Sequence, residues 1–429
     1  MLNSKGEREL AYVVLIDEVM PIEGYDRVEL ARVGGWHVIV QKNQFKVGDP
    51  AIYFEVDSKV PSDRECFAFL AKRKYKIKTI KMCGVVSQGL LMHANDFGWE
   101  VRFNHGLYIS KNNEEFISND PFILDNNGVE HHYADESRFL TEILGVVHIE
   151  DEDNAKSAPV DKYKTMAQRR PDIFKRKWAR WMMRREWGRK LMFALFGCKK
   201  KKSETAFPTK FPFVHKSDEE RIENCIFYLK DQEHKWIKTV KIDGTSSLYV
   251  LERKPFNRRE YYVCSRNVRQ LNENQKCYHS DNVYWAVEHK FHIRSFLEAM
   301  LKMHPDWQYV AVQGETAGVS EDGSKIQGDP HQFGELRFFA YNFIDPINGR
   351  WNSVAAKTLL KSFGIEFVPI VDKEYTLPDN IEDFKREADG ECEAPGAHGM
   401  REGYVYRRCD NCNISFKNVS NLYLLKHNI

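Results

Sequence analysis

The sequence lacks long apolar runs, and its amino terminus lacks the basic-then-apolar pattern of a secretory signal. The first absence argues against a segment that crosses a bilayer, and the second argues against export. Cysteine is scarce as well. The nine cysteines are odd in number and scattered, which favours reduced thiols over a disulfide framework. Together these patterns predict an intracellular protein, either cytoplasmic or nuclear.

The chain also has little net charge, because 64 basic residues nearly balance 62 acidic ones. A surface that binds a polyanion must therefore come from local segregation of charge. What the chain does have is apolar content of 42% and aromatic content of 13% over 429 residues. Such a composition is typical of a folded protein with two or three domains, each with its own core.

The order of patterns along the chain predicts a multidomain, β-rich protein. We interpret residues 1–150 as an all-β barrel domain with an extension, and 205–429 as an α+β domain of antiparallel sheets with flanking helices. Residues 151–204 form a basic, tryptophan-containing helical linker or insert between them. In the first domain short apolar segments alternate with turn residues. Its expected strands are Ala11–Ile16, Val28–Val33, His37–Gln41, Pro50–Val56 and Tyr75–Met82.

Two segments concentrate positive charge. In Ala71–Lys81 cations alternate with apolar residues, which in a strand would form a basic row suited to a phosphate backbone, or an edge guarded by lysines. In the insert, a helix is expected from Pro171 to Phe196, followed by the run Lys199–Lys202. The insert could bind nucleic acid, an acidic membrane surface or calmodulin, or be a solvated linker. We favour nucleic acid because of the rest of the chain.

The hexapeptide Lys241–Ser246 lies between two expected strands, Trp236–Val240 and Ser247–Leu251. A lysine at a strand end, on a turn that glycine permits, can project its amine into a cleft. When neutral, such an amine can attack a nucleotide phosphate. An exposed hairpin turn is the alternative, and the hexapeptide alone does not decide between them.

Further charged and aromatic residues recur at strand ends downstream of this lysine. Arg266 and Asn267 suit a phosphate or a ribose, and an aromatic strand could stack on a base. The charged and aromatic residues, each with its expected strand, are Ser265–Asn267 after Tyr261–Cys264, Glu315 after Tyr309–Gln313, Phe339 within Leu336–Phe343, Glu402 before Gly403–Tyr406, and Lys417 after Ile414–Phe416. Ser217–Glu220 predicts a capping box that opens a helix. Further helices are expected over Asn282–His289, Ile293–Met303 and Val354–Phe363.

In this order the residues resemble the motifs of the covalent nucleotidyltransferase superfamily of ligases and capping enzymes. Matched in turn are motif I (Lys241–Gly244), the motif between I and III in RNA ligases (Ser265–Asn267), motif III (Gly314-Glu315), motif IIIa (Phe338–Phe343), motif IV (Glu402-Gly403) and motif V (Lys417). The resemblance implies an ATP-grasp-like ligase domain. The chain departs from the pattern at Val240, where many RNA ligases carry an acid, and at Asn418 and Val419, because a second motif V lysine is missing.

The amino-terminal strings narrow the resemblance to the Deinococcus type of RNA ligase. They are Pro21–Gly24, Phe45–Asp49, Tyr53–Asp57 and Gln88–Leu91. This implies that the barrel of residues 1–150 is OB-like and precedes the transferase domain. It also implies an ATP-dependent ligase that joins 3′-OH and 5′-phosphate ends through lysine–AMP and RNA-adenylate. The expected partner is nicked duplex RNA or an RNA/DNA hybrid, and we expect a monomer. The alternatives are a GTP-dependent guanylyltransferase, which the missing carboxy-terminal OB domain disfavours, and a non-catalytic RNA-binding protein on a ligase scaffold.

The resemblance also implies residue roles and cofactors. Lys241 would be the nucleophile that carries AMP, with Glu402 and Lys417 also catalytic. The residues expected to contact the nucleotide are Asp243, Gly244, Arg266, Asn267, Glu315, Phe339 and Lys417. The expected cofactors are ATP and Mg²⁺, with Mn²⁺ as a substitute. The metal would be held largely through water by Glu402, Glu315 and Asp243, with Glu23 and Asp26 as further candidates.

Cys409-Asp-Asn-Cys412 has the spacing of half a zinc site, with Cys392 and His398 upstream. A second Cys-x-x-Cys pair is missing from the sequence, so free thiols are the favoured interpretation.

Overall fold

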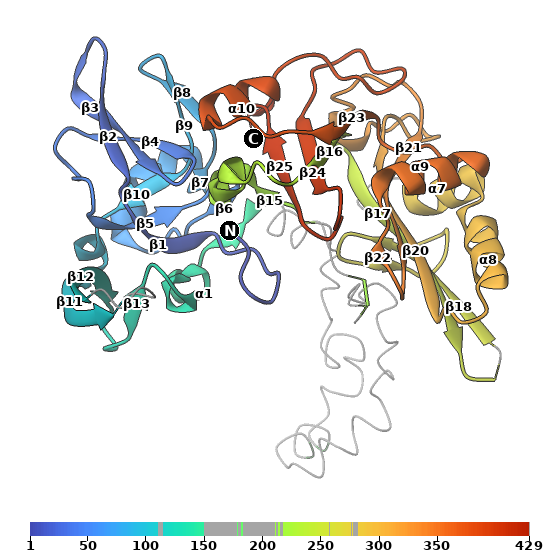
Figure 1. Ribbon diagram of the computed structural model, residues 1–429, viewed down its shortest axis with the longest axis horizontal. Helices are drawn as coiled ribbons and strands as arrows, with labels where there is room; N and C mark the ends of the chain where they lie inside the picture. Colours follow the sequence, from blue (N-terminus) through green and yellow to red (C-terminus); the bar gives the residue numbers. More distant parts are fainter. Residues whose placement is uncertain are drawn as a thin grey trace.

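The computed structural model describes residues 1–109, 115–149, 178, 182, 211, 213–214, 218–256, 258–275, 277 and 282–428. The helix expected from Pro171 and the run Lys199–Lys202 therefore lie outside what is described, apart from two single residues. The described chain forms two β-rich bodies, with the amino-terminal strands on one side and the carboxy-terminal sheets on the other (Figure 1). The prediction of a multidomain, β-rich fold is confirmed.

The amino-terminal body is built from small antiparallel sheets of OB-like arrangement, and its described strands do not close into a single barrel. One sheet has the order β1-β5-β10 and another β2-β3-β4. Strand β5 is buried along its whole length, as a strand between two cores must be. The bounds are β1 Ala11–Leu15, β2 Glu18–Ile22, β3 Tyr25–Val33, β4 Trp36–Gln41, β5 Pro50–Phe54, β6 Ser58–Lys59, β9 Val85–Ser87 and β10 Leu90–Met92.

The strand expected over Tyr75–Met82 is wrong. A 3-10 helix, η1 (Glu65–Arg73), precedes two short strands, β7 (Lys76–Ile77) and β8 (Ile80–Met82). Phe67 and Leu70, three residues apart, are both buried, and that spacing suits one face of a 3-10 turn. Lys74 and Tyr75 then adopt φ of +54° and +61°, which breaks extended pairing. The alternating cations therefore do not form one continuous row.

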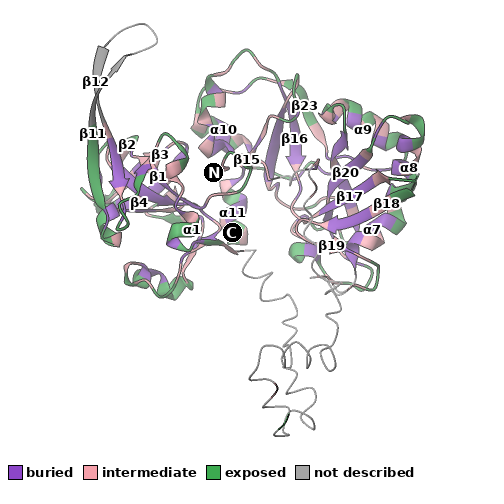
Figure 2. Ribbon diagram, turned by 90° about the horizontal axis from the view of Figure 1, so that it is seen from below, coloured by how far each residue is buried: buried purple, intermediate pink, exposed green. Residues whose placement is uncertain are grey.

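Residues that follow the OB-like strands extend the same core. Trp99, Ile123 and Leu144 are buried in one hydrophobic cluster with Leu10 and Phe54. The β11–β12 hairpin projects from this body, and the first residues of β11, Glu100–Asn104, are exposed (Figure 2). The bounds are η2 Ala94–Phe97, β11 Glu100–Ile109, β12 Glu115–Leu124, β13 Glu130–His132, η3 Glu136–Arg138, α1 Thr141–Leu144 and β14 Val147–His148.

The carboxy-terminal body holds two larger sheets, of order β15-β25-β24-β16-β23 and β19-β18-β17-β20-β21-β22. Their facing sides share a hydrophobic cluster that includes Trp236, Tyr249 and Phe338. The strands are β15 Glu220–Arg221, β16 Trp236–Lys241, β17 Thr245–Lys254, β18 Arg258–Ser265, β19 Arg269–Gln270, β20 Tyr309–Ala317, β21 Arg337–Asp345, β22 Gly349–Arg350, β23 Ile370–Tyr375, β24 Gly403–Arg408 and β25 Ser415–Val419.

Helices cover the outer side of these sheets, as the purple and green faces in Figure 2 show. In α8, the apolar residues recur every three or four positions and are buried against β17 and β20, so the helix expected over Ile293–Met303 is confirmed with those bounds. The elements are η4 Ile222–Asn224, η5 Ile226–Lys230, α7 Val283–Phe291, α8 Ile293–Met303, η6 Ile326–Gly328, α9 Ser353–Ser362, α10 Ile381–Glu387 and α11 Asn421–His427.

The helix expected to open at Ser217–Glu220 is wrong. Ser217 lies outside the described residues, and β15 begins at Glu220 and pairs in parallel with β25. The carboxylate that a capping box would use, that of Glu220, instead accepts hydrogen bonds from the Leu2 N–H and from Asn224 Nδ2, and the neighbouring acids bind other groups as well. Asp218 Oδ1 lies 3.3 Å from Lys417 Nζ, and Glu219 accepts a hydrogen bond from Ser415 Oγ at 2.5 Å. These tertiary contacts override the local capping signal.

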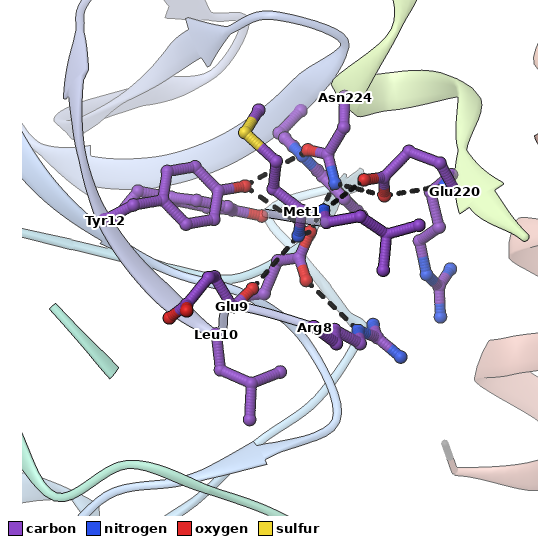
Figure 3. Close-up of polar contacts among 12 residues, drawn as sticks. Met1, Arg8, Glu9, Leu10, Tyr12, Glu220 and Asn224 are labelled. Carbon is purple, nitrogen blue, oxygen red and sulfur yellow. Dashed lines mark hydrogen bonds and ion pairs between the residues drawn. The ribbon is translucent and has the colours of Figure 1, made fainter. Parts of the chain in front are cut away.

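The two bodies meet at a polar cluster around Asn224, at the end of η4 (Figure 3). Its Oδ1 accepts hydrogen bonds from Tyr12 Oη at 3.1 Å and Trp36 Nε1 at 2.6 Å. Its Nδ2 donates to Glu55 Oε1 at 2.5 Å. Close by, Arg221 and Asp57 form an ion pair across the same junction at 2.9 Å. The amino-terminal body is thus attached directly to the segment that leads into β16.

Candidate active site

Lys241 is the last residue of β16, and strand pairing brings it to a carboxylate. Its backbone lies opposite Gly403 of β24, so that Glu402 comes alongside the lysine. Lys241 Nζ lies 2.6 Å from Glu402 Oε2, and both side chains are largely buried. At Gly403 a Cβ would lie 2.2 Å from the carbonyl oxygen of Asn418, so only glycine fits this close approach of β24 to β25.

The turn after the lysine joins the two sheets. At Gly244 a Cβ would lie 2.3 Å from the carbonyl oxygen of Thr316, so the turn can cross β20 only with glycine there. Beyond it, β17 pairs with β20 so that Ser246 lies opposite Glu315. The pairing brings the Glu315 carboxylate close enough to Lys241 to raise the pKa of that lysine.

Three carboxylates surround the lysine and set its charge. Burial alone would lower the pKa of Lys241, but Glu402, Glu315 and Asp243 outweigh it and raise that pKa. For Glu315, burial and the neighbouring carboxylates Glu402 and Asp243 prevail over the attraction of Lys241 and raise its pKa to about 8. The lysine is therefore a cation, and one carboxyl group of the cluster keeps its proton.

A second cluster, of cations around Asp218, adjoins the first. Asp218 accepts from Arg266 Nη2 at 2.8 Å and lies 3.3 Å from Lys417 Nζ. Burial lowers the pKa of Lys417, a trend that the cations Arg8 and Arg221 reinforce and that Asp218 opposes. Two of the predicted phosphate-binding residues are therefore held together by a carboxylate that the motifs do not include.

The aromatic strand β21 lies beside β20, on the side away from β17. Phe339 lies opposite Glu315 in the β20–β21 pairing, but its ring is fully buried and packs against Phe333, with ring centroids 5.4 Å apart. Two residues on, Tyr341 Oη lies 3.0 Å from Ser246 Oγ. Stacking of Phe339 on a base thus stays a prediction, and Asn267, half-buried just beyond β18, stays one too.

Two sets of candidate ligands are not brought to this site. Glu23 and Asp26 are exposed on the β2–β3 hairpin, which Figure 1 shows on the far side of the amino-terminal body from Lys241. Cys409 and Cys412 are free thiols that donate to the carbonyls of Lys373 and Arg408. In the described ranges, no three His, Cys, Asp or Glu side chains lie close enough together to hold a metal ion directly.

Sequence reasoning missed three residues of the site: Asp218, His331 and Tyr423. His331 Nε2 accepts a hydrogen bond from the backbone N–H of Asp243 at 2.8 Å, and burial lowers the pKa of its ring. Tyr423 Oη donates to Asp243 Oδ2 at 2.6 Å. Asp218 had a signal in the acidic run that was interpreted as a cap, whereas His331 and Tyr423 stand in no motif.

Comparisons with known proteins agree with this geometry. A family model described as RNA ligase matches residues 234–420, and one described as an OB-fold domain matches residues 10–94. A search of curated proteins finds no match. None of the helices in the described ranges is long and apolar enough to cross a membrane.

Solved structures share the fold over nearly the whole chain. Naegleria gruberi RNA ligase with PPi aligns at 22% identity and a TM-score of 0.66, covering 98% of this chain and 99% of that one. A variant of the same ligase with AMP and Mn aligns at 23% identity and a TM-score of 0.65, covering 98% and 99%. Residues 234–420 therefore resemble the RNA ligase family, and the matching OB-fold domain lies before them in the chain.

Proposed function

We propose that this chain is an ATP-dependent RNA ligase that joins a 3′-OH end to a 5′-phosphate end at nicks in duplex RNA or RNA/DNA hybrids. The observation that carries the proposal is the setting of Lys241, beside Glu402 and next to the cations Arg266 and Lys417, within an RNA ligase domain. The proposal is supported by the fold shared with Naegleria gruberi RNA ligase, whose solved forms include complexes with ATP and Mn and with PPi.

In the first step the Lys241 amine attacks the α-phosphorus of ATP. A P–N bond forms, and the bond from that phosphorus to the pyrophosphate oxygen breaks, so that pyrophosphate leaves. The ammonium must first lose a proton, because a protonated amine has no lone pair to donate. Glu402 Oε2, 2.6 Å from Nζ, is in position to accept this proton.

In the second step an oxygen of the RNA 5′-phosphate attacks the phosphorus of the lysine–AMP. The P–N bond breaks, the lysine regains a proton, and AMP is left on the RNA end. In the third step the 3′-oxygen attacks the 5′-phosphate phosphorus, AMP leaves, and a phosphodiester bond closes the strand. Arg266 and Lys417 would offset the phosphate charge in these steps by exchanging Asp218 for phosphate oxygens.

The carboxylates around Lys241 fit a divalent cation, Mg²⁺ with Mn²⁺ as a substitute. They are hard oxygen donors, and burial together with the neighbouring carboxylates Glu402 and Asp243 raises the pKa of Glu315 to about 8. We propose that Glu402, Glu315 and Asp243 hold the ion largely through water, which suits the reluctance of Mg²⁺ to lose its waters. When bound, the cation supplies charge neutralisation for the phosphates of the nucleotide.

The proposal also covers the oligomeric state and the cellular location of the protein. We propose that it acts as a monomer in the cytoplasm or nucleus. All eight described cysteines are free thiols, which fits a reducing compartment.

The first test is incubation with ATP or GTP labelled at the α-phosphate, followed by a denaturing gel. We expect label from ATP on the wild-type protein, and none on Lys241→Ala. Lys361→Ala, which removes an exposed lysine of α9, is the matched control and should label like the wild type. Label from GTP alone would identify a guanylyltransferase, and label from neither nucleotide would overturn the enzyme proposal.

A second assay addresses the RNA substrate. We expect the labelled enzyme to seal a nick with an RNA 3′-OH end and to release AMP. Binding of nicked duplexes by a protein that never becomes labelled would instead support the non-catalytic alternative.

A further inference from the structure

Asp243, two positions after Lys241, forms hydrogen bonds, as donor and as acceptor, with residues outside its own strand and turn. His331, in the loop after η6, is fully buried, and its Nε2 accepts the backbone N–H of Asp243 at 2.8 Å. An acceptor nitrogen carries no proton, so the ring must be neutral, with its proton on Nδ1. The loop has this reach because Gln327 and Asp329, at φ of +48° and +52°, turn the chain back towards the site.

Tyr423 holds the same residue by its side chain. It lies in α11, is fully buried, and donates its hydroxyl proton to Asp243 Oδ2 at 2.6 Å. Ser420 caps this helix, accepting from the backbone N–H of Tyr423 at 3.0 Å, so the tyrosine starts from a fixed first turn. The rings of His331 and Tyr423 lie nearly parallel, with centroids 6.2 Å apart.

We propose that His331 and Tyr423 are positioning residues that clamp Asp243 and so fix the turn that aims Lys241 at the α-phosphorus. The inference deepens the proposed function and rests on it. Among the described residues, no hydrogen bond or ion pair joins either side chain to Lys241, although the charge of Lys241 adds to burial in lowering the pKa of the His331 ring. The direct link of each side chain is its hydrogen bond to Asp243. His331 binds the backbone N–H of Asp243 and Tyr423 binds its carboxylate, so the aspartate has little freedom to rotate.

The clamp predicts a loss of rate rather than of nucleotide affinity. A reacting atom misplaced by about 1 Å can cost on the order of 10²-fold in rate. Because the clamp acts through Asp243 and supplies no group of its own to the nucleotide, a change in His331 or Tyr423 should leave the KM for ATP within about twofold, as expected when only transition-state interactions are lost. A general loosening of the fold would raise KM and lower kcat together.

The test measures the rate of self-adenylylation for three substitutions at one position. Here kcat is the single-turnover rate constant at saturating ATP, and KM is the ATP concentration that gives half of it. In His331→Gln the amide oxygen reaches about as far as Nε2 and can accept the Asp243 N–H, whereas in His331→Asn it falls about one bond short. We expect His331→Gln to keep at least a third of the wild-type kcat, and His331→Asn and His331→Leu to lose about tenfold or more. The pair Gln and Asn keeps the comparison valid if the leucine variant fails to fold.

Tyr423→Phe supplies the second arm, because it removes only the hydroxyl group. We expect kcat to fall about fivefold or more, and the double variant with His331→Asn to lose less than the product of the two single effects, since both act on one residue. Equal kcat for His331→Gln and His331→Asn, or wild-type kcat for Tyr423→Phe, would overturn the clamp. Either of these two outcomes can be observed only if the wild-type protein becomes adenylylated. Failure of the clamp is therefore distinct from failure of the proposed function, in which the wild-type protein is not labelled at all.

Discussion

At the scale of single residues, the site is organised by an excess of negative charge around one lysine. Lys241 is paired with Glu402, while Glu315 and Asp243 add two more carboxylates around it. Three carboxylates beside one lysine cannot all be ionised in a buried site without a large cost, so one of them keeps its proton. Glu315, whose pKa is raised to about 8, is that residue.

Protonation of Glu315 makes the stability of the protein depend on pH. Below about pH 4.5 the residue is protonated in both folded and unfolded chains. Between about pH 4.5 and pH 8 the unfolded chain has released the proton while the folded chain retains it, so the free energy of unfolding falls as pH rises, by up to about 1.4 kcal/mol per pH unit. We expect Glu315→Gln to remove this loss, measured by urea unfolding at pH 5 and pH 8 in metal-free buffer.

The control for this experiment is Glu298→Gln, which alters an exposed ion pair with Arg294 in α8. It should keep the wild-type dependence of stability on pH, because an exposed pair contributes little. If Glu315→Gln loses as much stability as the wild type between pH 5 and pH 8, Glu315 is not the proton-retaining group.

The site residues that could be predicted from the sequence are those with a reactive or charged side chain at the end of a strand. Lys241, Glu315 and Glu402 met this condition, and the structure brings them together. His331 could not be found in this way, because its role is to meet a backbone N–H from another element, and no spacing in the sequence encodes that contact. Asp218 was visible as an acid, but its partner Lys417 lies 199 positions along the chain.

At the scale of elements, periodic patterns predicted well and local signals predicted poorly. The buried stripe of α8 repeats over eleven residues, and a pattern of that length outweighs any single contact. In contrast, the acidic run before β15 and the alternating cations of Ala71–Lys81 are short. Tertiary contacts determine the structure of the acidic run, such as the contact of Asp218 with Lys417. Burial of Phe67 and Leu70 in η1 determines the structure that leads into the alternating cations.

The segment before β15 yields a prediction about stability. Asp218 is the counter-ion of Lys417, whose side chain is 13% exposed, and of Arg266. In Asp218→Ala the lysine would be left in a buried site without its carboxylate. We expect the free energy of unfolding to fall by roughly 2–3 kcal/mol, less than for a fully buried pair because Arg266 is partly exposed. Urea unfolding at pH 7 measures the change.

Glu298→Ala serves as the control for this loss, because it breaks a pair that is exposed on both sides. Its effect should stay within about 0.5 kcal/mol. If Asp218→Ala is no more destabilising than this control, the Asp218–Lys417 pair is not a structural element of the site.

At the scale of the whole molecule, the two bodies are joined mainly through the segment of β15 and η4, where Arg221 pairs with Asp57 and Asn224 bonds to Glu55. Glu55 is fully buried in the amino-terminal body, and although burial favours its neutral form, the Met1 amino group, Arg8 and Asn224 lower its pKa to about 2. A buried carboxylate of this kind depends on its partners, and Asn224 comes from the other body (Figure 3). The same asparagine leads, within seventeen residues, to Lys241.

Asn224 should therefore decide whether the two bodies unfold together. In Asn224→Ala the Tyr12 hydroxyl, the Trp36 N–H and the Glu55 carboxylate each lose a partner at the junction. We expect a loss of about 2–4 kcal/mol and a calorimetric trace that separates into two transitions, because unsatisfied buried polar groups cost about 1–3 kcal/mol each. Asn126→Ala, at an exposed asparagine of the amino-terminal body, should keep the wild-type trace. A single transition at the wild-type temperature in Asn224→Ala would show that the bodies are held together by other contacts, and the OB-like domain would then not be coupled to the lysine site through η4.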